Sequence, residues 1–187
     1  MKLLVTILFV SLSIYTFSQG AFYKRNLTLY SNTINSIAEY EDGFILVGSS
    51  DQGSSGTNGY VLLMDKNGSV IWDRIIPAVS DYDVYRKVVY QNGFFYIGAI
   101  VRSNNKSFCQ LIKMDLEGNV LFKRIFGSEQ VHYSEHFITD MLLADDGILV
   151  SGSRMNGANL QGELVKLNFE ANIVWQKQYI YNGSLPN

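Results

Sequence analysis

The sequence predicts an all-β fold built from about three four-stranded antiparallel units. The chain has 187 residues, 13% of them aromatic, with twelve Tyr and eleven Phe against only two Pro. Aromatic residues suit the half-buried surface of a strand, and Pro is largely kept out of strands. Two sequence patterns also recur with a period of about 50 residues. After the N-terminal leader, no segment shows a helical period.

The first 18 residues predict a cleaved signal peptide. Lys2 supplies the positive charge, and an apolar stretch covers Leu3 to about Tyr15. Thr16, Phe17 and Ser18 place small residues at −3 and −1 of a cleavage site, which makes residues 19–187 the mature chain. A membrane anchor is the alternative, but the stretch is short for a span of roughly 20 residues. We expect a mature chain without a membrane span that is secreted, periplasmic or on the cell surface.

The clearest pattern is YVLLMDKNGSVIWDRII, from Tyr60 to Ile76. It reads as an apolar strand, a tight Asp-Lys-Asn-Gly turn and a second strand with an aromatic residue. Related segments begin at Gln110 and Glu163. An aromatic residue followed by polar residues recurs at the same place, with about 50 residues between copies, at Tyr23, Trp72, Phe122 and Trp175.

The second pattern is EDGFILVGS at Glu41, with copies QNGFFYIGA at Gln91 and DDGILVSGS at Asp145. Asp42-Gly43 predicts a hairpin turn in which Gly43 supplies a positive φ angle. Together the two patterns predict four strands in each unit. In the first unit these are Ile34–Tyr40, Phe44–Ser49, Tyr60–Met64 and Val70–Ile76.

The predicted units cover about residues 31–76, 82–126 and 136–181, and an orphan strand at 22–29 resembles the last strand of a unit. Periods near 50 residues with strand content indicate β-propeller blades. Closed propellers typically have about four to eight blades, so three blades predict a partial or open propeller. Truncation of a longer propeller is the preferred explanation. Assembly of several copies and an open array are the alternatives.

The pattern of apolar strand, Asp-x-x-Gly, apolar residues and Trp resembles secreted bacterial β-propeller repeat proteins, especially PQQ-like or quinoprotein-like blades. The resemblance covers about residues 22–181 and implies a propeller fold without fixing an activity. Blades of that family usually carry an additional Thr in the turn, which Asp65, Asp115 and Asn168 lack, and Ala171 replaces the third Gly. Redox members need further blades and an axial cofactor site, so we expect no cofactor here.

The string His132-Tyr133-Ser134-Glu135-His136 matches the H-x-x-E-H motif of inverted zinc peptidases. That chemistry requires a helix, on which the two histidines share one face and bind zinc. Here the string lies between two predicted strands, and no third ligand follows on a helix. We interpret it as a loop between units.

Calcium binding is a second metal hypothesis, because Asp65-Lys66-Asn67-Gly68 is weakly similar to a calcium loop and Asp81 and Asp83 could add carboxylates. A turn is the preferred interpretation, since Asp and Asn side chains cap such turns. Cys109 is the only cysteine, which excludes an intramolecular disulfide. Its apolar strand predicts a buried, inert thiol.

Two further predictions concern the strand that ends each unit. Trp72 and Trp175 are expected in the core between units, and Lys123 and Arg124 on solvated outer edges.

The net charge is −2 without a long run of one sign, which argues against nucleic-acid binding. We expect a non-enzymatic exported module that binds an unidentified protein or glycan through its loops, or that acts as a surface scaffold. The alternative is an N-terminal fragment of an exported propeller enzyme, quinoprotein-like or a hydrolase, with its active site outside this chain. No residue is assigned as catalytic, cofactor-binding or metal-binding, and a homo-oligomer stays open.

Overall fold

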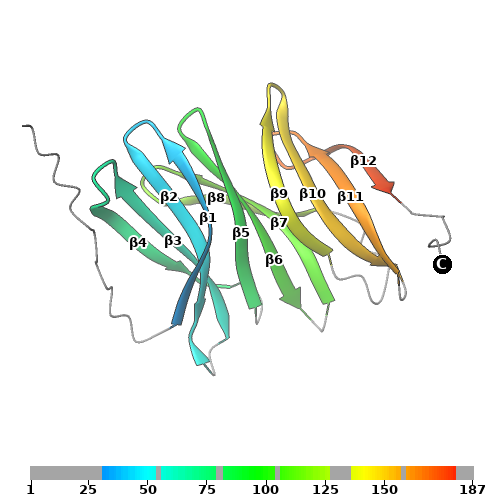
Figure 1. Ribbon diagram of the computed structural model, residues 1–187, viewed down its shortest axis with the longest axis horizontal. Coiled ribbons are helices and arrows are strands. Elements are labelled where there is room, and N and C mark those ends of the chain that lie inside the picture. The colour runs from blue at the N-terminus through cyan, green and yellow to red at the C-terminus, as the bar shows by residue number, and fades with distance from the viewer. Residues whose placement is uncertain are drawn as a thin grey trace, which may run out of the picture.

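The computed structural model describes residues 31–53, 56–78, 82–103, 106–126, 136–156 and 159–179. These residues form twelve strands in two sheets, so the all-β prediction is confirmed (Figure 1). The predicted signal peptide (1–18) and orphan strand (22–29) lie outside the described residues. The strands are β1 (Ser31–Tyr40), β2 (Gly43–Asp51), β3 (Thr57–Asp65), β4 (Val70–Ile76), β5 (Tyr82–Gln91), β6 (Phe94–Ser103), β7 (Lys106–Asp115), β8 (Val120–Phe126), β9 (His136–Ala144), β10 (Gly147–Asn156), β11 (Asn159–Leu167) and β12 (Ile173–Tyr179).

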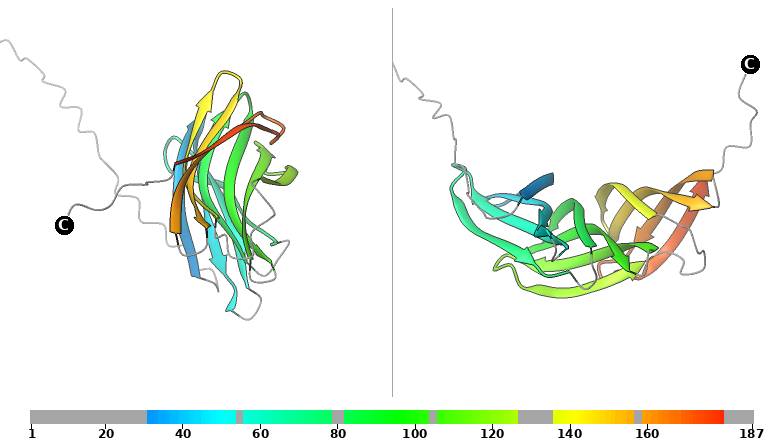
Figure 2. Two further views of the ribbon diagram at one scale, coloured as in Figure 1. Left: turned by 90° about the vertical axis from the view of Figure 1, so that its right-hand side faces the viewer. Right: turned by 90° about the horizontal axis from the view of Figure 1, so that it is seen from below.

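The strands form three antiparallel meanders, which we call the first unit (β1–β4), the second unit (β5–β8) and the third unit (β9–β12). The first two units join into one eight-stranded sheet through a single parallel bridge between Thr57 and Tyr82. The third unit is a sheet of its own. The units follow one another along an arc, and the described strands do not close into a ring (Figure 2).

The turn between the third and fourth strands of each unit has the same construction. In the first unit, Oδ1 of Asp65 accepts hydrogen bonds from the backbone N–H groups of Asn67 (2.9 Å) and Ser69 (2.7 Å). Asp115 and Asn168 accept the corresponding bonds from Asn119 (2.7 Å) and Asn172 (2.8 Å). A short polar side chain that binds its own backbone explains why these positions are Asp or Asn. The predicted turn at Asp65 is confirmed.

The hairpin turns between the first two strands correct one prediction. In the second unit, Asn92 and Gly93 are the two turn residues, with φ angles of 49° and 80°. In the first unit, Gly43 is instead a strand residue that pairs with Tyr40, so it does not supply the positive φ angle of the turn. Glycine is needed there because a Cβ atom would lie 2.0 Å from the carbonyl oxygen of Met64.

The hydrophobic core consists of two clusters, each between neighbouring units. The first cluster packs the first unit against the second, through residues that include Ile45, Val61, Tyr85, Phe95 and Met114. The second cluster packs the second unit against the third, through residues that include Tyr96, Leu111, Ile138, Val150 and Val165. Among the described residues, the middle unit is therefore covered on both faces, and the two outer units are each covered by another unit on one.

Candidate functional site

Trp72 and Arg74 on β4 hold the turn between β7 and β8 of the next unit. The indole Nε1 of Trp72 donates a hydrogen bond to the carbonyl oxygen of Leu116 (3.1 Å). The Arg74 guanidinium lies 5.5 Å from the Trp72 ring centroid and donates to the carbonyl oxygens of Glu117 (2.7 Å) and Gly118 (3.3 Å). A Cβ atom on Gly118 would lie 3.1 Å from Cη2 of Trp72, so glycine lets the indole sit against the backbone.

Phe122 and Arg124 on β8 make the corresponding contact with the third unit. The Arg124 guanidinium lies 5.3 Å from the Phe122 ring centroid, and its Nη1 donates to the carbonyl oxygen of Glu170 (2.6 Å). The next turn residue, Ala171, is buried in the same cluster as Phe122 and has a φ angle of 63°. The smaller aromatic ring thus packs against a cluster that includes alanine at this turn position, whereas Trp72 lies against glycine. We call this arrangement of an aromatic residue, a basic residue and a turn the junction contact.

Trp175 and Lys177 on β12 carry the same pair of groups at the outer end of the third unit. The Lys177 ammonium lies 5.5 Å from the Trp175 ring centroid. Trp175 is nevertheless 38% exposed. The prediction of a tryptophan between units is therefore confirmed for Trp72, which packs against the first cluster, and wrong for Trp175. The reason is that no further turn lies against β12 in the described part of the chain.

Lys123 and Arg124 were expected on solvated edges, and the structure corrects this for Lys123 while Arg124 is exposed as expected. The ammonium of Lys123 donates to the carbonyl oxygen of Pro77 (3.1 Å) and lies 3.6 Å from Oδ2 of Asp83, whose side chain is fully buried. Arg124 remains exposed but binds the third unit. The sequence does contain a signal for these contacts, which is a basic residue two positions after each aromatic residue. Residues i and i+2 of a strand point to the same face, so the two side chains can contact the same neighbouring turn.

The zinc hypothesis, which the sequence disfavours, rests on residues that the structure describes only in part. His132 and Glu135 lie outside the described residues, and His136 is the first residue of a strand. Among the residues that the structure describes, no group of three or more His, Cys, Asp or Glu side chains could hold a metal ion.

The carboxylates of the calcium hypothesis have other roles. Oδ1 of Asp65 is engaged by the backbone of its own turn. Asp83 forms an ion pair with Lys123, and Asp81 lies outside the described residues.

Cys109 on β7 is buried in the second cluster, as predicted. Burial, and then the nearby Glu163 carboxylate, raise the pKa of its thiol to about 12. The reactive thiolate is therefore scarce at neutral pH, and the residue serves the core rather than chemistry.

At one end of the molecule the second strand of each unit ends and the third begins (Figure 1). We call it the loop end and define it by Asp51, Thr57, Tyr82 and Arg102. The exposed Arg102 guanidinium lies 5.6 Å from the Tyr82 ring centroid. Asp51 is exposed and accepts a hydrogen bond from the backbone N–H of Gly53 (2.9 Å). The loop end thus offers a carboxylate, a guanidinium and an aromatic ring.

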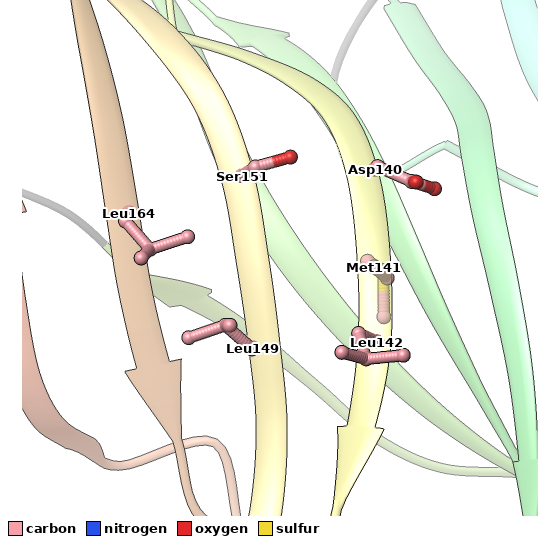
Figure 3. A pocket seen from close by; sticks show the side chains of 6 residues that line it. All are labelled: Asp140, Met141, Leu142, Leu149, Ser151 and Leu164. Atoms are coloured by element: carbon pink, nitrogen blue, oxygen red, sulfur yellow. The ribbon is translucent and has the colours of Figure 1, made fainter.

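A shallow hollow lies on the third unit, over β9, β10 and β11 (Figure 3). Strand register places Leu149 beside Lys166, and Lys166 beside Trp175, so the exposed tryptophan lies on the same face of the sheet as Leu149. The hollow is lined by Asp140, Met141, Leu142, Leu149, Ser151 and Leu164.

No protein-family model matches the chain, and a search of curated proteins finds no match. In the described part of the chain, no helix has the length and apolar character needed to cross a membrane. The function must therefore be inferred from the residues and contacts of the chain itself.

Proposed function

We propose that the chain is an exported, non-enzymatic β-propeller-type module that binds a protein or a glycan at its loop end, or that spaces such sites as a surface scaffold. In this proposal each four-stranded unit is one blade, and the three units form part of a propeller or an open array.

The observation that carries the propeller-type arrangement is the junction contact, which occurs twice with the same parts. Trp72 and Arg74 hold the turn of the second unit, and Phe122 and Arg124 hold the turn of the third. A contact repeated in this way supports a similar rotation between successive units, as in architectures built by radial or linear repetition. The arc in Figure 2 is consistent with such a rotation.

The loop end supports a binding role because each unit contributes the adjoining ends of its second and third strands to it (Figure 1). Several strand ends side by side give a broad surface with more than one contact point. Arg102 can form paired hydrogen bonds with carboxylates and other anionic groups. The Tyr82 ring offers an apolar face with a polar tip, which suits both protein and sugar surfaces. Because Thr57 pairs with Tyr82, the first two units hold this part of the surface together.

Binding can be tested with the mature chain, residues 19–187, on a glycan array and on a displayed peptide library, followed by calorimetry with any hit. Arg102→Ala and Tyr82→Ala should each weaken the binding of that ligand by about tenfold or more, which corresponds to about 1.4 kcal/mol. The matched control is Asp145→Ala, an exposed turn residue at the opposite end of the units. A ligand that binds both loop-end variants as tightly as the parent would contradict the proposed surface.

Export is tested separately. Expression of all 187 residues in a secreting bacterium should give a product that begins at Gln19. Mass spectrometry of the exported fraction checks this, and an uncleaved product retained in the cell would contradict export.

A further inference from the structure

We propose that the outer face of the third unit binds the outer face of the first unit of a second copy of this chain, head to tail. The first face, called the tail face, consists of Leu142, Leu149, Leu164, Trp175, Lys177 and Tyr179. The second, called the head face, consists of Ile34, Ile37 and the turn Asp65–Ser69.

The tail face repeats a surface that is already used twice within the chain. By strand register, Trp175 opposes Lys166 as Trp72 opposes Leu63 and Phe122 opposes Lys113. Lys177 lies over the Trp175 ring as Arg74 lies over Trp72, with 5.5 Å to the centroid in both pairs. The aromatic and basic groups of a junction contact are therefore already in place on β12.

Other positions on the tail face are buried only where a unit follows. Tyr179 opposes Gly162, and the equivalent pairs are Ile76 with Gly59 and Phe126 with Cys109. Ile76 and Phe126 are buried at the junctions, whereas Tyr179 is exposed. A Cβ atom on Gly59 would lie 2.1 Å from the Tyr85 ring of the next unit, whereas the nearest atom at Gly162 is 3.7 Å away, in Tyr179 of the same unit. Among the described residues, no other unit reaches Gly162, whereas Tyr85 of the next unit fills the space over Gly59.

The head face shows the complementary pattern. Ile34 and Ile37 on β1 are 43% and 59% exposed. The register of β1 with β2 is repeated by β5 with β6 and by β9 with β10, including a bulge at the same place. In those units the equivalent side chains are buried against the preceding unit, and they are Tyr85, Val88, Ile138 and Met141. Ile34 therefore corresponds to Tyr85, the residue that fills the space over Gly59 in the first junction.

The turn of the head face fits the tryptophan of the tail face. Within the chain, Trp72 lies against Gly118, and the smaller Phe122 packs against the cluster that contains Ala171. The first unit has Gly68 at this turn position, with a φ angle of 78°. Gly68 therefore leaves the space that the large indole of Trp175 requires. Lys66 and Asn67 occupy the positions equivalent to Leu116 and Glu117, whose carbonyl oxygens accept hydrogen bonds in the first junction. In the proposed contact, the Lys177 ammonium is the hydrogen-bond donor.

A second copy is the occupant because one chain carries both halves of the contact but holds them apart. The first and third units lie at opposite ends of the arc (Figure 2). Joining unlike faces of identical chains gives a heterologous interface, which produces a ring if the rotation closes and a longer assembly if it does not. Closure after two chains would give a ring of six units. This self-association is independent of any ligand at the loop end.

The test uses size exclusion with light scattering on the mature chain over a range of concentrations. The parent should show a mass of two chains or more. Trp175→Asp on the tail face and Ile37→Asp on the head face should each give a monomer, and Lys177→Glu should weaken assembly without a change in the core. The matched control is Gln178→Asp, an exposed residue on the same strand whose side chain points to the other face. That control should assemble as the parent does.

Mixing distinguishes the proposal from simple loss of folding. The Trp175→Asp chain keeps an intact head face, and the Ile37→Asp chain keeps an intact tail face. An equimolar mixture of the two monomers should therefore form a one-to-one heterodimer through a single junction. A parent that stays monomeric at every concentration overturns the proposal, as does an assembly that neither variant changes. The proposal would also be overturned by a monomer whose own residues Tyr23–Arg25 cross-link to Asn67, because a segment of the same chain would then cover the head face.

Discussion

The indole N–H of Trp72 donates a hydrogen bond to the carbonyl oxygen of Leu116, 44 residues further along the chain. This bond joins the last strand of one unit to the last turn of the next. The same indole packs against the first hydrophobic cluster and lies under the Arg74 guanidinium. One side chain thus combines apolar burial, a hydrogen bond and a cation–π contact at the boundary between two units.

Trp72→Ala should lower the free energy of unfolding by about 3–5 kcal/mol, because it removes a large aromatic side chain and leaves the Leu116 carbonyl oxygen without its donor. Urea unfolding followed by circular dichroism measures the change. Trp72→Phe should cost less, since Phe122 holds the equivalent position at the second junction.

The matched control for this prediction is Trp175→Ala, which changes the same residue type at the equivalent position of β12. Trp175 is exposed, so in dilute solution its loss should change the free energy of unfolding by only about 0.5 kcal/mol. Equal effects of the two substitutions would show that the hydrogen bond and burial of Trp72 contribute nothing specific.

Ring size and turn residue should be coupled at the second junction. Phe122→Trp should destabilise the chain by about 1–3 kcal/mol, because the larger indole overpacks the space beside Ala171. Adding Ala171→Gly should recover most of this loss, since it reproduces the combination found at the first junction. Alone, Ala171→Gly should change stability by only about 1 kcal/mol, because relief of the left-handed conformation offsets lost methyl burial and the greater freedom of glycine. Denaturant unfolding of the four proteins in a double-mutant cycle measures the coupling, and additive effects would contradict size matching.

Much of the local structure could be predicted from the sequence because it depends on neighbouring residues. The strand predicted at Val70–Ile76 is β4, and the turn at Asp65 has the predicted side-chain bonds. The contacts between units could not be predicted in the same way. The acceptors of Trp72 and Arg74 are backbone carbonyl oxygens, which every residue has, so Leu116 and Glu117 carry no mark of their role.

The exposure of Trp175 shows a second limit of sequence reasoning. Alternation of polar and apolar residues indicates which face of a strand is apolar. It does not tell whether another unit covers that face. Trp72 and Trp175 have similar neighbours in sequence, yet one is covered by a turn and the other is exposed. The contact between Arg102 and Tyr82 at the loop end could not be predicted either, because it depends on the pairing of β5 with β6.

The ion pair between Lys123 and Asp83 should be important for stability because the Asp83 side chain is fully buried. Lys123→Met should lower the free energy of unfolding by about 3–5 kcal/mol at neutral pH, since it leaves a buried carboxylate without its cation. Lys66→Met, at an exposed turn position, is the control and should have little effect. Urea unfolding measures both.

Asp83→Asn tests whether the effect of Lys123 depends on the carboxylate. In the Asp83→Asn background, Lys123→Met should cost clearly less than it does in the parent, because no buried charge is left behind. The same loss in both backgrounds would mean that packing of the lysine stem or its bond to Pro77 dominates.

The thiol of Cys109 should resist modification in the folded chain. Burial and the Glu163 carboxylate raise its pKa to about 12, from an ordinary value of 9.0, so the thiolate is rare at pH 8. Alkylation by iodoacetamide should be slow in the native protein and rapid in urea, as followed by mass spectrometry. A folded-state pKa above the unfolded value favours the native state below pH 9, and this contribution is lost as the pH rises from 9 toward 12. The decline in stability over that range should therefore be shallower in Cys109→Ala, and rapid native alkylation at pH 8 would contradict the buried thiol.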